Sequence, residues 1–185
     1  MKIAQYFPMW EQLTAREQET LSNAASYQTV NKGTVLHNGA ADCTGLMLVC
    51  SGQLRAYILS EEGREITLYR LFEMDICLFS ASCIMHSVQF DVTIEAEKDS
   101  SFWLIPTDVY QQMMKTSAPL ANYTNEIMAS RFSDVMWAMQ QILFMGADKR
   151  LAIFLWDEIA KTGSDSIKMT HEQIARYMGS AREVV

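Results

Sequence analysis

The spacing of hydrophobic residues changes partway along the chain, and its first half has the short period of β-strands. Between residues 26 and 105, short runs rich in β-branched and aromatic residues are separated by glycines such as Gly33, Gly52 and Gly63. These runs predict strands at residues 29–36, 45–50, 53–59, 65–71, 90–97 and 101–105. Short antiparallel strands at this spacing are typical of a barrel or a sandwich. Helical turns are expected before them, where Thr14 and Glu17 form a capping box.

After Pro106 the hydrophobic residues follow the longer period of helices. A helix is predicted at residues 108–115, and residues 120–145, which contain no Gly or Pro, predict one long helix. Apolar positions in this helix are alternately four and three residues apart, which is typical of a coiled-coil seam. The seam residues are Met128, Phe132, Val135, Met139 and Ile142. The alternative is a helix packed on its own barrel, since only about four heptad positions match cleanly.

The last part of the chain predicts a helix at residues 149–161, a second helix and then a tight turn. Asp148 can cap the first of these helices, and Gly163 ends it. Thr170 and Gln173 fit a capping box that opens the second helix, and Gly179 stands where that helix ends.

A third helix is expected directly after this turn. Ser180 and Glu183 fit another capping box, and the small Ala175 lets the third helix cross the second. Two helices joined in this way form a helix-turn-helix, a common DNA reader. The chain reaches barely one turn into the second helix of the reader, the recognition helix.

Composition and charge are those of a globular protein. The chain has 185 residues, of which 49% are hydrophobic and 20% charged, enough to bury a core. Its net charge is −7, but residues 147–185 carry six basic and six acidic side chains, so the acidic excess lies entirely in residues 1–146. An acidic body joined to a neutral segment is compatible with DNA binding. No apolar run reaches the ~18 residues of a membrane span, and no signal-peptide core is present, so a cytoplasmic location is expected.

The sequence contains no constellation typical of an enzyme. Four cysteines are too sparse for a disulfide scaffold, so reduced thiols are expected. His37, His86 and His171 are far apart and lack the spacing of metal ligands. Neither a Gly-x-Ser-x-Gly motif nor a phosphate loop is present. We therefore expect a protein that is not an enzyme.

Four motifs together are specific: Gly52-Gln-Leu-Arg55, Gly63-Arg-Glu-Ile66, Asp148-Lys-Arg-Leu-Ala152 and Gly179-Ser-Ala-Arg-Glu-Val184. With the order of elements, they make the chain resemble the Crp/Fnr family of bacterial transcription regulators over essentially its whole length. The resemblance implies an α+β protein. An antiparallel jelly-roll (double-stranded β-helix) barrel like cyclic nucleotide-binding domains is expected at residues 1–118, a dimerisation helix at 119–146, and an incomplete winged helix-turn-helix at 147–185. It also implies a homodimer on a pseudo-palindromic operator, a small-molecule effector and RNA polymerase as a partner.

The resemblance also bears on the effector. In cyclic AMP-binding members, a Gly-Glu pair holds the ribose and an arginine followed by a small hydroxyl residue clamps the phosphate. This chain lacks the pair after residue 71, and Phe90 and Asp91 stand near the arginine position. The adenine-reading hydroxyls of the long helix are replaced by Val135 and Met136. Because an aspartate repels a phosphodiester, cyclic AMP is not the expected effector. Nor is an iron–sulfur cluster, because no cysteine precedes Cys43.

The cofactor and the effector stay open at this point. The candidate effector pocket comprises Cys77, Leu78, Ser80, Ser82, Cys83 and Arg131. A thiol or haem sensor is one reading, with His86 or Met74 as further ligands. The favoured alternative is that the cysteines pack as small apolar residues. The resemblance places Arg131 in the effector pocket; the alternative is that it is solvated or bridges the two chains of the dimer.

The candidate DNA contacts are Thr170, Ser180, Arg182 and Glu183. Arginine can donate two hydrogen bonds to guanine, and glutamate can accept one from cytosine, although capping the helix is an equal alternative for Glu183. A ligand-binding module that acts on a protein partner is the alternative function. The encoded sequence beyond Val185 discriminates the two, since a basic wing hairpin there supports the DNA regulator.

Overall fold

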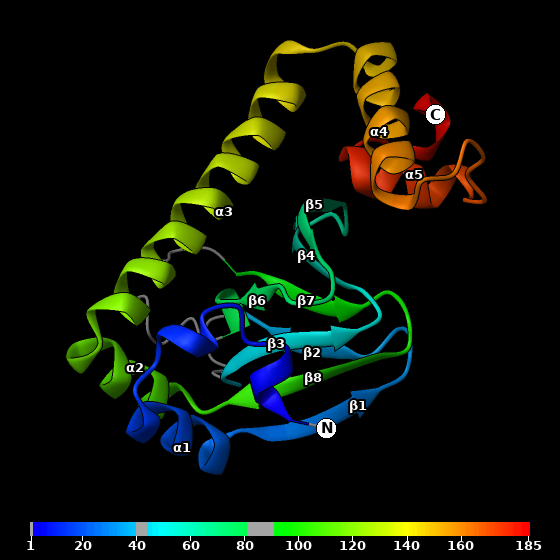
Figure 1. Ribbon diagram of the computed structural model, residues 1–185. Helices are drawn as coiled ribbons and strands as arrows, with labels where there is room; N and C mark the ends of the chain where they lie inside the picture. The colour runs from blue at the N-terminus through cyan, green and yellow to red at the C-terminus, as the bar shows by residue number, and fades with distance from the viewer. Residues whose placement is uncertain (1, 40–43, 81–90) are drawn as a thin grey trace.

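The computed structural model describes residues 2–39, 44–80 and 91–185, and it shows a β-barrel flanked by helices. Within these residues, eight strands form two antiparallel sheets, with the orders β1-β8-β3-β6 and β2-β7-β4-β5 (Figure 1). The predicted antiparallel jelly-roll is therefore confirmed. The strands are β1 (Ser26–Val30), β2 (Val35–Asn38), β3 (Leu46–Ser51), β4 (Leu54–Leu59), β5 (Glu65–Leu71), β6 (Ile76–Cys77), β7 (Thr93–Ala96) and β8 (Ser100–Ile105).

Two details of the strand prediction are wrong. The single strand expected at residues 29–36 is two strands, because Gly33 turns the chain with φ +85° and its amide donates to the Ala96 carbonyl at 2.7 Å. β1 then pairs with β8 in one sheet and β2 with β7 in the other. The short β6 was not predicted; it forms because Ile76 and Cys77 pair with β3.

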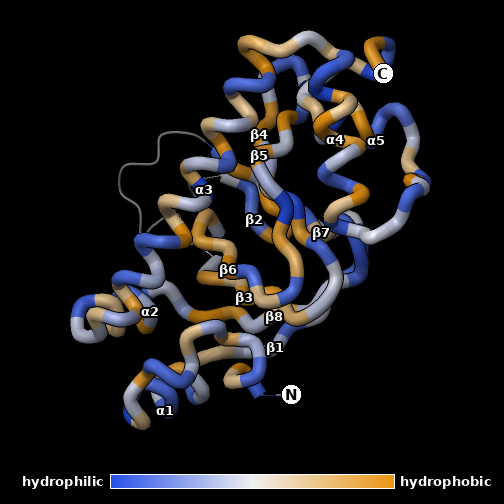
Figure 2. Tube along the Cα trace, turned by 45° about the horizontal axis from the view of Figure 1, so that its top comes forward, coloured by the Kyte–Doolittle hydropathy of each residue, from blue (hydrophilic) through white to orange (hydrophobic). Residues whose placement is uncertain are grey.

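Two apolar clusters hold the barrel and the helices around it together. The first fills the barrel and includes Leu54, Leu71, Ile94 and Phe102. The second lies between β3 and the helices η1 (Ile3–Gln5), η2 (Trp10–Gln12), α1 (Ala15–Ala24) and α2 (Thr107–Thr116). The predicted capping box opens α1, where the Thr14 amide donates to the Glu17 carboxylate at 2.7 Å. Figure 2 shows hydrophobic residues along the barrel strands and also along the long helix.

The long helix and the reader follow the barrel. The predicted long helix is α3 (Ala118–Phe144), which leaves the barrel on one side and leads through a short connection to α4 (Ala147–Thr162) (Figure 1). The reader continues with α5 (His171–Met178) and the short 3₁₀ turn η4 (Arg182–Val184). No helix in the described part of the chain is long and apolar enough to span a membrane.

Two of the predicted helix caps are wrong. Gly146 is the N-cap of α4, and Asp148 lies inside the first turn, where its charge favours the helix dipole but its side chain makes no cap. The capping box of Ser180 and Glu183 does not form either. Ala181 precedes η4 without a side-chain cap, and the Ser180 amide donates instead to the Ala175 carbonyl at 2.9 Å, which closes α5.

Candidate functional site

The first helix of the helix-turn-helix, α5, which follows α4 in the reader, is closed at both ends by hydrogen bonds from its own sequence. At its start, the Gln173 amide donates to the Thr170 hydroxyl at 3.2 Å, and the Thr170 amide donates to Gln173 Oε1 at 2.9 Å. At its end, Gly179 has φ +57° and the Ser180 amide donates to the Ala175 carbonyl at 2.9 Å. These are the bonds of a capping box and of a Schellman motif. The predicted helix and its turn are confirmed.

The residues expected to contact DNA lie at the two ends of this helix. Arg182 and Glu183 are exposed in η4, and Ser180 is half-buried in the turn. Thr170 is exposed and uses its oxygen as a helix cap, which leaves its O–H able to donate to a phosphate. Thr170 thus lies at the N-terminal end of α5, and the other three residues follow its C-terminal end. Their contacts to DNA stay predictions.

Helices α4 and α5 pack on the outer face of β5. Arg70 of β5 donates twice to Glu158 of α4, with Nη2–Oε2 and Nη1–Oε1 distances of 2.6 and 3.3 Å. The side chains are only 7% and 6% exposed. The Arg70 guanidinium also lies 4.6 Å from the ring centre of Tyr177, which stacks on Phe154 with ring centres 5.4 Å apart. Glu158 is thus a buried carboxylate paired with a buried guanidinium.

Tyr177 also joins α5 to the residue that follows β7. Its hydroxyl donates to the Glu97 carboxylate at 2.6 Å. Glu97 accepts a second hydrogen bond from Gln53 at 2.6 Å and lies 3.5 Å from Arg55 Nε. Burial, and then the negative charge of Glu97, raise the pKa of Tyr177 well above its ordinary value. The hydroxyl therefore stays protonated and remains a donor at neutral pH.

The hairpin of β4 and β5 reaches the turn of the reader. The Thr67 hydroxyl donates to the Arg176 carbonyl at 3.1 Å, and the Arg64 guanidinium donates to the Gly179 carbonyl. The Arg176 guanidinium lies 3.9 Å from Glu65 of β5. The barrel thus holds both the main chain and a basic side chain at the C-terminal end of α5.

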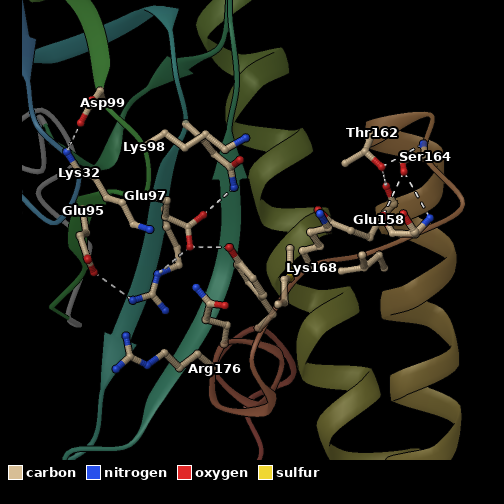
Figure 3. Close-up of a pocket in the computed structure, with 17 residues that line it drawn as sticks. Lys32, Glu95, Glu97, Lys98, Asp99, Glu158, Thr162, Ser164, Lys168 and Arg176 are labelled. Atoms are coloured by element: carbon tan, nitrogen blue, oxygen red, sulfur yellow. Dashed lines mark hydrogen bonds and ion pairs between the residues drawn. The ribbon is translucent and has the colours of Figure 1, made fainter.

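A cleft of about 760 Å³ separates the barrel from the reader beside these contacts (Figure 3). Glu95 and Glu97 face it from the barrel, and Lys168 and Arg176 face it from the reader. Both barrel carboxylates are already paired with Arg55, at 3.1 and 3.5 Å. The cleft therefore brings together charges of both signs from the two halves of the molecule.

Arg131 of α3, predicted in the effector pocket, is held by two carboxylates. Its guanidinium nitrogens lie 3.0 Å from Asp75 and 3.1 Å from Asp134, and its carbon lies 4.7 Å from the ring centre of Tyr69. Burial acts to lower the pKa of Arg131, but the charges of Asp75 and Asp134 and the hydrogen bond to Asp134 more than offset it. An anionic ligand at this guanidinium would therefore meet two carboxylates that already engage its Nη1 and Nη2 groups.

The other described residues of the predicted pocket are buried. Cys77, Leu78 and Ser80 are almost fully buried, and the Ser80 hydroxyl donates to the Gly45 carbonyl at 2.6 Å. Burial raises the pKa of the Cys77 thiol, which therefore stays protonated at neutral pH. Ser82 and Cys83 lie outside the described residues, as does His86.

Two observations in the described part of the chain concern the metal and haem alternatives. Met74, considered as a soft ligand, is 46% exposed. Among residues 2–39, 44–80 and 91–185, no three His, Cys, Asp or Glu side chains are grouped as metal ligands.

The predicted seam residues of α3 lie in four different environments. Phe132 and Met139 are exposed, Val135 is half-buried, and Met128 packs against the apolar cluster below the barrel. Ile142 approaches the reader, since its Cδ1 lies 3.4 Å from where a Cβ on Gly179 would stand.

An exposed apolar stripe runs along α3 in a slightly different register. It consists of Phe132, Met136, Met139 and Leu143, with successive spacings of four, three and four residues. This spacing keeps all four side chains on one face of the helix. The structure thus leaves a seam-like face of α3 uncovered within one chain.

The comparisons with known proteins agree with this architecture. Residues 27–117 match the model of the cyclic nucleotide-binding domain family. A crystal structure from Eubacterium rectale, described as a transcriptional regulator of the crp/fnr family, is 59% identical in sequence and has a TM-score of 0.90. The alignment covers 97% of this chain and 83% of the other. The chain belongs to the Crp/Fnr family. A search of curated proteins finds no match.

Two more distant structures share the fold of this Crp/Fnr protein. One is CLP of Xanthomonas campestris, described as a c-di-GMP responsive global regulator, with 18% identity, a TM-score of 0.74 and coverage of 92% of this chain and 87% of that one. The other is FixK2 of Bradyrhizobium japonicum, with 17% identity, a TM-score of 0.72 and coverage of 86% and 80%. At these identities the likeness concerns the fold alone.

Sequence reasoning missed the residues with which this Crp/Fnr protein joins its barrel to its reader. One of them left a signal: Glu158 follows Phe154 by four residues and Leu151 by seven, which places a carboxylate on the inward face of α4. A charge on such a face predicts a buried partner. The partner, Arg70, lies 88 residues away and has no local signal.

Proposed function

We propose that this Crp/Fnr-type transcriptional regulator binds a pseudo-palindromic operator as a homodimer and responds to a small molecule other than cyclic AMP. The observation that carries the proposal is the unit formed by α5 and its turn. Its capping box and Schellman motif fix the direction in which the chain leaves Gly179, and Arg182 stands exposed directly beyond. A reader of this kind places the start of its next helix in the major groove.

The exposed side chains after the turn have the chemistry of base and phosphate contacts. Arg182 can donate two hydrogen bonds to O6 and N7 of guanine, and Glu183 can accept one from N4 of cytosine. Thr170 and Ser180 can donate to phosphates and so position the reader. Because the partner is chromosomal DNA, the proposal places the protein in the cytoplasm. RNA polymerase is the second partner, whose action at the promoter depends on whether the regulator is bound.

The uncovered stripe of α3 supports the homodimer. Four large apolar side chains on one face of a helix are poorly placed in water, and a second copy of the same helix covers them by knobs-into-holes packing. The stripe shares Phe132 and Met139 with the predicted seam and adds Met136 and Leu143. A two-fold axis along α3 would then present two readers to two half-sites of DNA.

The environment of Arg131 supports an effector other than cyclic AMP. The guanidinium is already neutralised by Asp75 and Asp134. Asp91, which stands near the expected phosphate clamp, is exposed and carries a negative charge. A phosphodiester would meet repulsion at one position and competition at the other.

Selection from a randomised duplex library at fixed salt tests the function. The protein as its gene encodes it should enrich a sequence with two inverted half-sites whose centres are about 34 Å, or one helical turn, apart. Binding without any enriched sequence, or no binding at any salt, would favour a module that acts on a protein partner.

A further inference from the structure

The contacts between barrel and reader form one connected network of polar groups. Glu158 pairs with Arg70, the Arg70 guanidinium lies on Tyr177, and Tyr177 donates to Glu97. Glu97 in turn pairs with Arg55. We infer that the pairs Arg70–Glu158 and Tyr177–Glu97 form an interdomain lock that holds the reader in a docked state with low affinity for DNA. The inference rests on the proposed function, because it assumes that the reader binds DNA.

The lock specifies one docked position of the reader. Glu158 has little exposure and would be an uncompensated buried charge if α4 shifted away from Arg70 without entering water. Tyr177 likewise has one acceptor, Glu97, within reach of its hydroxyl among the described contacts. Both groups are fully hydrated when the reader leaves the barrel, and a buried ion pair roughly breaks even against its hydrated state. Such a lock selects a geometry strongly and still opens readily.

The docked state opposes DNA binding in two ways. Arg176 is a basic side chain of the reader that could contact a phosphate, and in the docked state its guanidinium lies 3.9 Å from Glu65 of the barrel. The hairpin tip between β4 and β5 carries Glu61 and Glu62, close in sequence to Arg64, which contacts the Gly179 carbonyl. Carboxylates near the reader repel DNA phosphates, over a Debye length of about 8 Å at physiological salt.

Strand β5 connects the lock with the barrel interior. Tyr69 points inward, where its ring lies beside Phe79 and under Arg131. The next residue, Arg70, points outward to Glu158, because successive side chains of a strand face opposite sides. A molecule that displaces Tyr69 would therefore move the backbone that carries Arg70. This gives the effector a direct route to the lock.

A charge exchange across the lock tests the inference. Arg70→Glu and Glu158→Arg, made singly, should each undock the reader, and the double variant should restore docking because it restores an ion pair with opposite polarity. The radius of gyration from solution X-ray scattering reports docking without DNA, and a titration with a random-sequence duplex reports affinity. If the docked form holds about 90% of the molecules, undocking raises the apparent affinity about tenfold.

The two single variants change the net charge in opposite directions, which separates the lock from general electrostatics. Arg70→Glu makes the protein more acidic and still should bind DNA more tightly. Tyr177→Phe supplies a milder, charge-neutral variant that keeps the ring stacked on Phe154 and should give a smaller change of the same sign. Tyr27→Phe, on the exposed edge of β1, is its matched control and should change neither measurement.

Three results would overturn the inference. An unchanged radius in both charge variants and in Tyr177→Phe would show that these contacts do not hold the reader. A larger radius with unchanged or weaker DNA binding would show that the docked state is not inhibitory. If even undocked variants bind no duplex, the proposed function fails and the inhibitory role fails with it, while the scattering data still decide whether the lock exists.

Discussion

Replacing Phe132 by Asp should dissociate the proposed dimer. Phe132 is 68% exposed and is the first residue of the apolar stripe of α3. Burying a whole phenylalanine side chain contributes about 1.5–3 kcal/mol, so covering the exposed fraction contributes about 1–2 kcal/mol in each protomer. The substitution acts twice in a symmetric dimer, which gives a loss of about 2–4 kcal/mol before the cost of burying two carboxylates is added. Since each 1.4 kcal/mol is a factor of ten, the dimer dissociation constant should rise at least about 30-fold.

Sedimentation velocity over a range of protein concentrations measures this change. Phe144→Asp is the control, because Phe144 is 80% exposed on the same helix but lies off the stripe. We expect it to leave the dimer largely intact. A wild-type protein that is monomeric at all concentrations, or a Phe132→Asp variant as dimeric as the control, would refute the assignment of this face as the dimer seam.

Four smaller predictions follow from individual side chains. Burial raises the pKa of Tyr110 to about 12 from 10.0. Because the folded state keeps this proton to a higher pH than the unfolded state does, the free energy of unfolding should fall by about 2–3 kcal/mol as the pH rises from 10 to 12. In urea titrations, Tyr110→Phe should remove that part of the pH dependence. Burial raises the pKa of Cys50 to about 11 and also raises that of Cys77, so peptides containing either thiol should resist alkylation at pH 8 until the protein is denatured. Thr170→Ala should cost about 1 kcal/mol and lower the Tm by about 2–4 °C, whereas Thr170→Ser should keep the cap and the Tm. Millimolar cyclic AMP should leave the Tm unchanged, whereas a ligand at 100 times its Kd would add about 2.7 kcal/mol of stability.

Helices whose ends are determined by neighbouring residues could be predicted from the sequence. The capping boxes at Thr14 and Thr170 and the left-handed Gly179 require residues only a few positions apart. The break at Gly33 was harder, because the glycine interrupts a run with strand propensity on both sides, and only the pairing with two different sheets shows where each strand ends. The length of β6, two residues, is below what a periodic pattern can reveal.

The interface between barrel and reader could not be predicted as a set of pairs. Thr67 and the Arg176 carbonyl are 109 residues apart. The sequence around a threonine on a strand does not indicate a main-chain partner at that separation. Ser180 and Glu183 show the opposite difficulty, since a local capping signal is present and the Schellman bond from Ser180 is formed in its place. Local signals thus predicted where α1 and α5 begin, and tertiary contacts decided which polar groups became buried.

The central claim is that residues in the turn after α5 read DNA sequence. The base preference of Arg182→Ala tests this claim most directly. The encoded protein and the variant are titrated against the same randomised operator library at one salt concentration, with Arg16→Ala as a control at an exposed arginine of α1. The account predicts that Arg182→Ala loses about 1–3 kcal/mol of discrimination at one base pair in each half-site, while Arg16→Ala keeps the wild-type preference. An unchanged preference in Arg182→Ala, in a protein that still binds the library, would contradict it.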